Sequence, residues 1–104
     1  MGGRLQDKVA IVTGSGSVGP GWGNGKAMSV LFARQGARVV GVDIDAAAAA
    51  ATQDIIDGEG GRAISVVADV TSGADVERLV AAALAAYGRI DILVNNVGIA
   101  VVGG

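Results

Sequence analysis

Residues 9–27 read VAIVTGSGSVGPGWGNGKA, in which a short apolar run ends at a glycine-rich loop that leads into a helical pattern. Six glycines fall between Gly14 and Gly25. The first turn of a helix offers unpaired N–H groups and the positive end of its dipole, so this order of elements suits a diphosphate. Glycine is needed where backbone must touch ligand, and Ser15 and Ser17 add hydroxyl donors. Taken alone, the glycines would fit a mobile connector equally well.

Strand and helix patterns alternate along the rest of the chain. Apolar runs predict strands over residues 9–13, 38–43, 63–68 and 90–94, and helical spacing predicts helices over 25–35, 46–57 and between Ser72 and Gly88. Asp45 and Ser72 are suited to begin helices, and Gly36, Gly58 and Gly88 to end them. With right-handed crossovers, this β-α-β-α-β-α-β order predicts a parallel sheet with helices on both faces. The α/β pattern fills residues 1–104 as a single domain.

Composition fits this fold and excludes several functions. Hydrophobic residues make up 51% of the chain and aromatic residues only 3%, as in a parallel sheet built from Val, Ile, Leu and Ala. A net charge of −2 without a basic stripe argues against nucleic acid as a partner. The lack of cysteine and histidine argues against a metal site. The polar start from Met1 to Lys8 and the absence of a long apolar run predict a cytoplasmic protein that does not bind membranes.

An acidic residue ends the second predicted strand, 18 residues after Gly25. Alternation along that strand brings Asp43 out at the carboxyl edge of the sheet, where ligands of such folds bind. A carboxylate there accepts hydrogen bonds from ribose hydroxyls and repels a 2′-phosphate. Because Ile44 follows and the glycine loop holds no Lys or Arg before Lys26, NAD is favoured over NADP. A plain turn residue is the alternative for Asp43, whereas helix capping fully explains Asp45.

Two further motifs follow the third and fourth strands. Asp69 can accept from an adenine amino group while Val70 packs on the ring, although a capping or turn role suits Asp69 as well. The sequence Asn95-Asn96-Val97-Gly98 can tie strand ends together and let the chain pass close to a ligand, with a plain turn as the alternative.

The remaining distinctive side chains have less specific interpretations. Trp22 is the only tryptophan and either plugs the glycine loop onto the protein body or lines a cofactor cleft. Tyr87 continues the apolar stripe of its helix and is expected in the core rather than in catalysis. Four arginines are expected on the solvated surface: Arg34, Arg62, Arg78 and Arg89.

In combination, these motifs resemble the short-chain dehydrogenase/reductase family, from Lys8 onward. The resemblance rests on Thr13-Gly14 with Gly23-Asn24-Gly25, then Asp43, Asp69-Val70 and Asn95-Asn96-Val97-Gly98. It implies a Rossmann-type three-layer α/β/α fold with its first four strands in the order 3-2-1-4. It also implies an NAD site and hydride transfer between nicotinamide and a small alcohol or carbonyl substrate, in a homo-oligomer (a tetramer or dimer). The predicted cofactor-binding residues are Gly14, Ser15, Ser17, Gly23, Asn24, Gly25, Asp43, Ile44, Asp69, Val70, Asn95, Asn96, Val97 and Gly98.

The sequence departs from the family pattern in three ways. Eight residues, Ser15 to Trp22, separate Gly14 from the Gly-x-Gly, where the family has a shorter spacing. The phosphate contacts are therefore open, with Gly14 the firmest, then Gly23 and Gly25. Val97 replaces a usual alanine. The family's catalytic serine and Tyr-x-x-x-Lys pair come after the Asn-Asn-x-Gly turn, and these 104 residues contain neither.

No catalytic residue is therefore assigned, and we expect the chain alone to be inactive and to be cut from a longer enzyme or incompletely recorded. An open fourth strand with Ile92 and Val94 at its edge would favour association. Two alternatives stay open. One is the enoyl-reductase branch of the same family, which shares a long glycine loop but is disfavoured by Asp69-Val70 and the paired asparagines. The other is a non-catalytic dinucleotide-binding or interaction module.

Overall fold

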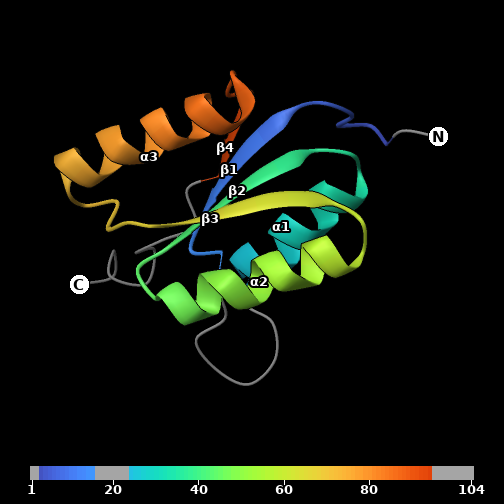
Figure 1. Ribbon diagram of the computed structural model, residues 1–104, viewed down its shortest axis with the longest axis horizontal. Coiled ribbons are helices and arrows are strands. Elements are labelled where there is room, and N and C mark those ends of the chain that lie inside the picture. The colour runs from blue at the N-terminus through green and yellow to red at the C-terminus, as the bar shows by residue number, and fades with distance from the viewer. Residues whose placement is uncertain (1–2, 16–23, 95–104) are drawn as a thin grey trace.

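The computed structural model describes residues 3–15 and 24–94. Within these ranges the chain forms β1 (Val9–Thr13), α1 (Asn24–Arg34), β2 (Arg38–Asp43), α2 (Ala46–Gly58), β3 (Arg62–Val67), α3 (Gly73–Tyr87) and β4 (Ile92–Val94). The alternation of strands and helices predicted from the apolar patterns is confirmed. Figure 1 shows the strands crossing the middle of the molecule between helices.

The four strands form one parallel sheet in the order β3-β2-β1-β4, which confirms the predicted order. β1 is a central strand, pairing with β2 from Val9 opposite Arg38 and with β4 from Ala10 opposite Ile92. β2 pairs in turn with β3 from Arg38 opposite Arg62. Because all pairs are parallel, the carboxyl ends of the strands meet at one edge of the sheet, as Rossmann-type folds require of a binding edge.

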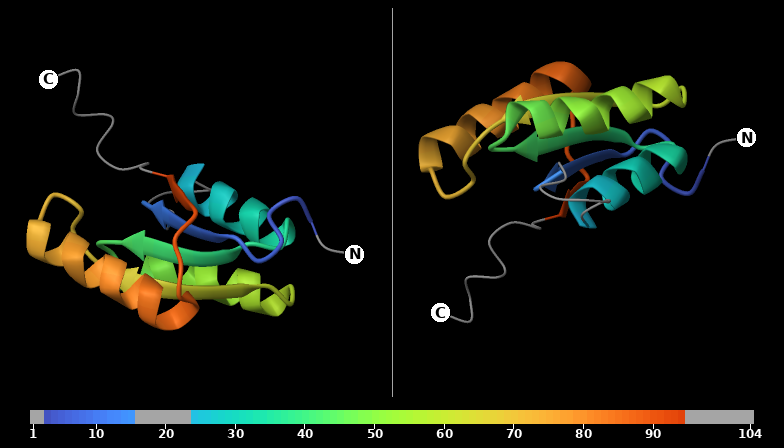
Figure 2. Two further views of the ribbon diagram at one scale, coloured as in Figure 1. Left: turned by 90° about the horizontal axis from the view of Figure 1, so that it is seen from above. Right: turned by 90° about the horizontal axis from the view of Figure 1, so that it is seen from below.

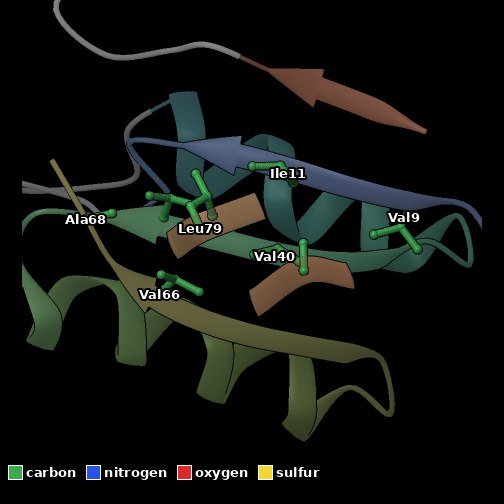
Figure 3. Packing of buried hydrophobic residues seen from close by; sticks show 8 residues of the cluster. Val9, Ile11, Val40, Val66, Ala68 and Leu79 are labelled. Carbon is green, nitrogen blue, oxygen red and sulfur yellow. The ribbon is translucent and has the colours of Figure 1, made fainter. Parts of the chain in front are cut away.

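Helices cover both faces of the sheet, with α3 on one side and α1 and α2 on the other (Figures 1 and 2). Side chains of β1 and β2 alternate between two apolar clusters. The α3-side cluster, of which Figure 3 shows the packing, contains Val9, Ile11, Val40, Val42, Val66, Ala68, Leu79 and Ala83. The opposite cluster contains Val12, Val30, Val39, Ile56 and Ala63. The three-layer α/β/α arrangement follows from this division.

The predicted helix starts are confirmed by their caps. The Asp45 carboxylate accepts from the N–H groups of Ala47 and Ala48 at 3.0 and 3.2 Å, and the Ser72 hydroxyl accepts from the Asp75 N–H at 3.4 Å. α3 ends as predicted at Gly88, which has a left-handed φ of 77° and whose backbone N–H donates to the Leu84 carbonyl with an N···O distance of 2.8 Å.

Several predicted boundaries differ from the structure by one or two residues. α2 ends at Gly58, within one residue of the prediction, but the residue that caps it is Glu59 and the positive φ of 84° falls on Gly60. The Glu59 N–H still bonds to the carbonyls of Ile55 and Ile56, so the helical pattern outlasts Gly58. β4 begins at Ile92 rather than residue 90, because Ile90 packs against the α3-side cluster before the strand pairing starts.

Candidate functional site

Three predicted site segments lie side by side at the carboxyl edge of the sheet. Gly14 follows β1, Asp43 ends β2, and Asp69 comes two residues after β3. Because β3, β2 and β1 are neighbours, these segments are adjacent in that order. Two backbone bonds join them: the Ser15 N–H donates to the Val42 carbonyl at 3.0 Å, and the Ala68 N–H donates to the Asp43 carbonyl at 3.2 Å.

The turn after β1 depends on glycine at its first position. Gly14 has a φ of 65°, in the left-handed region that favours glycine. Just before it, the Thr13 hydroxyl donates to the Val94 carbonyl at 3.0 Å and so ties this end of β1 to β4. The loop leads into α1, where Asn24 and Gly25 are the first two residues. Ser17, Trp22 and Gly23 lie outside the described residues.

Ser15 is fully buried and is held from three directions. Its N–H bonds to β2, and its carbonyl accepts a hydrogen bond from the Thr52 hydroxyl of α2 at 2.9 Å. Its side chain faces Gly41, where an added Cβ would lie only 2.9 Å from the Ser15 Oγ. That Oγ has no hydrogen-bond partner among the described residues.

Sequence reasoning missed Thr52, although a signal for it existed. The buried residues of α2 are Ala49, Thr52 and Ile56, spaced as one helix face. A polar residue at the inward position of an otherwise apolar face needs a hydrogen-bond partner.

Asp43 presents a nearly buried carboxylate beside the glycine turn. The residue is 8% exposed, and its Oδ1 accepts from the Asp45 N–H at 2.9 Å. Ile44, which follows, is 71% exposed and leaves an apolar surface next to the carboxylate. With Asp43 at the end of β2 and Asp45 capping α2, this connection carries two acidic residues and no basic one.

Asp69 adopts the turn role that the sequence left open. Its Oδ1 accepts from both the N–H and the hydroxyl of Thr71, at 2.9 and 2.6 Å. Those two hydrogen bonds hold the pKa of the Asp69 carboxyl below its usual value. Its own N–H donates to the Asp75 carboxylate at 2.8 Å. Val70 is half-buried and packs against the α3-side cluster. The contact of these two residues with adenine stays a prediction.

The arginines that were expected on the surface are exposed, and three of them also form ion pairs. Arg34 binds Glu59 through two bonds of 2.9 and 2.7 Å, and Arg89 binds Asp91 at 2.7 Å. Arg78 lies 3.5 Å from Asp75 and donates to the Val67 carbonyl at 2.6 Å. Arg78 therefore helps to fix the turn between β3 and α3, on which Asp69 lies.

Tyr87 lies at the other end of α3, away from the carboxyl edge. It packs against the α3-side cluster, and the Arg38 guanidinium lies 5.9 Å from its ring centre. Burial raises the pKa of its hydroxyl. At that same amino edge, residues including Asp7, Arg38 and Arg62 line a polar pocket of about 260 Å³. This pocket does not coincide with the predicted cofactor site.

In the described ranges, no cluster of acidic residues could hold a metal ion, and no helix is long and apolar enough to cross a membrane. The predicted Asn95-Asn96-Val97-Gly98 motif falls outside those ranges.

The sequence of this chain matches a known protein family. The model for the short chain dehydrogenase family matches residues 8–104, which is almost the whole chain. The chain belongs to the short-chain dehydrogenase family. This confirms the resemblance carried by the glycine turn, Asp43 and Asp69-Val70.

Relatives within the short-chain dehydrogenases are similar in both sequence and structure. The 7alpha-hydroxysteroid dehydrogenase of Escherichia coli K12 is 42% identical over 91% of this chain and 35% of its own length. A short-chain dehydrogenase/reductase from Burkholderia xenovorans is 56% identical with a TM-score of 0.87, over 92% of this chain and 38% of that one. The 3-ketoacyl-(acyl-carrier-protein) reductase of Brucella melitensis, solved with NADH, is 45% identical with a TM-score of 0.81, over 92% of this chain and 36% of that one. The chain spans about a third of the length of the curated relatives that it matches.

Proposed function

We propose that this chain is the NAD-binding part of a short-chain oxidoreductase that acts on an alcohol or carbonyl group. The observation that carries the proposal is the nearly buried carboxylate of Asp43 beside the Gly14 turn. The membership of the chain in the short-chain dehydrogenase family and the NADH bound to the Brucella melitensis relative support it.

The described residues fit a dinucleotide. Gly14 turns the chain with a positive φ, and α1 begins after the glycine-rich loop with the positive end of its dipole at the carboxyl edge. Asp43 supplies an acceptor for the two hydroxyls of a ribose, and the exposed Ile44 supplies an apolar surface for a base. This donor and acceptor set matches a diphosphate joined to adenosine.

Each residue then has a binding role rather than a chemical one. Gly14 and the start of α1, with Asn24 and Gly25, hold the diphosphate, while Asp43 orients the adenosine ribose. Ile44 and Val70 enclose the adenine, with Asp69 at its amino group.

Because the Ser15 hydroxyl is fully buried against Gly41, we propose that Ser15 contributes through its backbone, whose hydrogen bonds to Val42 and Thr52 hold the turn in place. Ser17, Gly23, Asn95, Asn96, Val97 and Gly98 complete the proposed site. When bound, NAD supplies the nicotinamide ring that exchanges a hydride with the substrate carbon.

The charge of the site favours NAD over NADP. A 2′-phosphate on the adenosine ribose would approach the Asp43 carboxylate at close range in a largely desolvated position, where like charges repel strongly. The loop between Thr13 and Gly25 contains no Lys or Arg that could offset this repulsion.

Titration of the purified chain with NADH and NADPH tests the proposal. NADH is expected to bind more tightly, and Asp43→Ala is expected to weaken NADH about tenfold or more, because hydrogen bonds to a charged group contribute about 1.5–3 kcal/mol. Asp54→Ala, which removes an exposed carboxylate on α2, is the matched control for net charge. Equal affinity of the wild-type chain for both cofactors would overturn the role of Asp43.

Assembly is also proposed to be homo-oligomeric. Val76, Val80, Leu84 and Leu93 remain 37 to 65% exposed in the described part of the chain, on the side of the sheet that α3 covers. An exposed apolar surface of this kind is typical of interaction sites. Sedimentation of the purified chain tests this, and a monomer at all concentrations would contradict it.

A further inference from the structure

Thr52 lies on α2, outside every motif of the cofactor site, and yet it contacts the glycine turn directly. We infer that Thr52 is a positioning residue for that turn: its buried hydroxyl holds the Ser15 carbonyl and thereby keeps the chain after β1 in the shape that receives the diphosphate. The diphosphate part of this inference rests on the proposed NAD-binding function.

Thr52 is 2% exposed and lies in a helix whose first six residues are all alanine. In a helix, a threonine hydroxyl ordinarily bonds to the carbonyl four residues back. Here that bond, to Ala48, measures 3.3 Å, whereas the bond to the Ser15 carbonyl measures 2.9 Å across 37 positions of sequence. The shorter bond therefore joins α2 to the glycine turn.

Both backbone polar groups of Ser15 form hydrogen bonds. Its N–H donates to the Val42 carbonyl of β2, and its carbonyl accepts from the Thr52 hydroxyl of α2. Its side chain fills the space left by the missing side chain of Gly41. Gly14, with its left-handed φ, is the residue immediately before this anchor. The direction in which the chain leaves β1 is thus set by one bond from the sheet and one from the helix.

The Thr52 hydroxyl can be removed with little change in the shape of the side chain. Valine has nearly the shape of threonine but cannot donate, so Thr52→Val would leave the buried Ser15 carbonyl without its partner. A buried acceptor that loses its hydrogen-bond partner destabilises the structure around it. The chain can reduce this destabilisation by moving Ser15 toward water, which displaces Gly14 and the diphosphate-binding backbone with it. Asp43, on β2, would keep its place.

The experiment compares Thr52→Val with two other variants of the full chain. Thr52→Ser retains the hydroxyl and is expected to behave like the wild type. Ile56→Val removes one methyl group from the same buried face, one turn along α2, and controls for loss of stability. For each variant, the affinities for NADH and for adenosine are measured by calorimetry, and the exchange rate of the Ser15 amide by NMR.

Thr52→Val is expected to weaken NADH about tenfold, which corresponds to one lost buried hydrogen bond. Adenosine, which has no diphosphate, is expected to change less than about twofold. Exchange of the Ser15 amide is expected to rise about tenfold. Thr52→Ser should show wild-type values for the NADH affinity, the adenosine affinity and the exchange rate of the Ser15 amide. Ile56→Val should change neither the ratio of the two affinities nor that exchange rate.

Three results would overturn the inference: equal weakening of NADH and adenosine, the same response from Ile56→Val, or an unchanged Ser15 amide in Thr52→Val. Failure of the proposed function has a different signature, because the wild-type chain would then bind neither ligand. In that case the role of Thr52 in diphosphate binding is also refuted, and the exchange rate of the Ser15 amide alone tests whether Thr52 holds the turn.

Discussion

The carboxylate of Asp91 accepts a hydrogen bond from the backbone N–H of Val9 at 2.9 Å, across 82 positions of sequence. The Asp91 N–H donates in turn to the Val9 carbonyl, also at 2.9 Å. These two bonds fix the entry to β4 against the first residue of β1. The other carboxylate oxygen of Asp91 accepts from Arg89 at 2.7 Å. Hydrogen bonds from Arg89 first and Val9 second hold the pKa of Asp91 below its usual value.

This lowered pKa predicts a loss of stability in acid. A carboxyl group whose pKa is lower in the folded state contributes stability above its unfolded pKa, about 3.9 for aspartate, and loses it as the pH falls through the folded value. Asp91→Asn is therefore expected to lower the urea midpoint at pH 7 and to reduce the further drop between pH 5 and pH 2.5. Asp54→Asn, on an exposed position of α2, is the control. An Asp91→Asn chain with the same acid sensitivity as the wild type would contradict this role.

Two leucines of α3 should differ sharply in their contribution to the core. Leu79 is 3% exposed and packs on the α3-side cluster, whereas Leu84 is 46% exposed. Leu79→Ala is expected to lower the free energy of unfolding by about 2–5 kcal/mol, through lost burial and the cavity left behind. Leu84→Ala is expected to lower it by less than about 1 kcal/mol. Urea unfolding followed by circular dichroism measures both, and similar values for the two would show that α3 packs on another face.

A side chain at Gly41 should be unfavourable, because the Ser15 side chain occupies the space. A Cβ at Gly41 would lie 2.9 Å from the Ser15 Oγ and 3.3 Å from the Ser15 Cβ. Gly41→Ala is therefore expected to cost about 1–3 kcal/mol of stability, as overpacking of a core does, and to weaken NADH binding by displacing the turn. Gly58→Ala is the matched control, since nothing lies within 4 Å of its added Cβ. If Gly41→Ala bound NADH as tightly as the wild type, the contact between β2 and the turn would have no part in binding.

The 104-residue chain is expected to bind cofactor without oxidising alcohols. Its single tyrosine, Tyr87, lies at the amino edge of the sheet and has no lysine four positions later. Incubation of the purified chain with NAD and a panel of secondary alcohols should give no NADH absorbance. Measurable turnover would reveal a catalytic group among these residues.

The sequence was sufficient for features that depend on local spacing. The caps at Asp45 and Ser72 were predictable because each bonds to N–H groups two or three residues ahead. The strand order was predicted by resemblance to a family, and the two sheet faces by alternation along β2. Asp43 could be placed at the carboxyl edge for the same reason.

Features that depend on tertiary contacts could not be predicted in this way. Thr52 and Ser15 are 37 positions apart, and Asp91 and Val9 are 82 apart, so no local pattern relates either pair. The left-handed residue after α2 could not be chosen from local spacing, because Gly58, Gly60 and Gly61 are three nearby candidates for it. Only the actual path of the chain selects Gly60 for the positive φ.

The place of β1 in the sheet also sets the order in which the protein can assemble. Its pairing with β2 joins residues 29 positions apart, whereas its pairing with β4 joins residues 82 positions apart. Closing so long a loop is entropically costly and slow. β1, β2 and β3 all precede β4 in the chain, so the side of β1 that β4 covers has no partner strand until β4 has been synthesised and pairs with it. The glycine turn lies at the end of this half-covered strand.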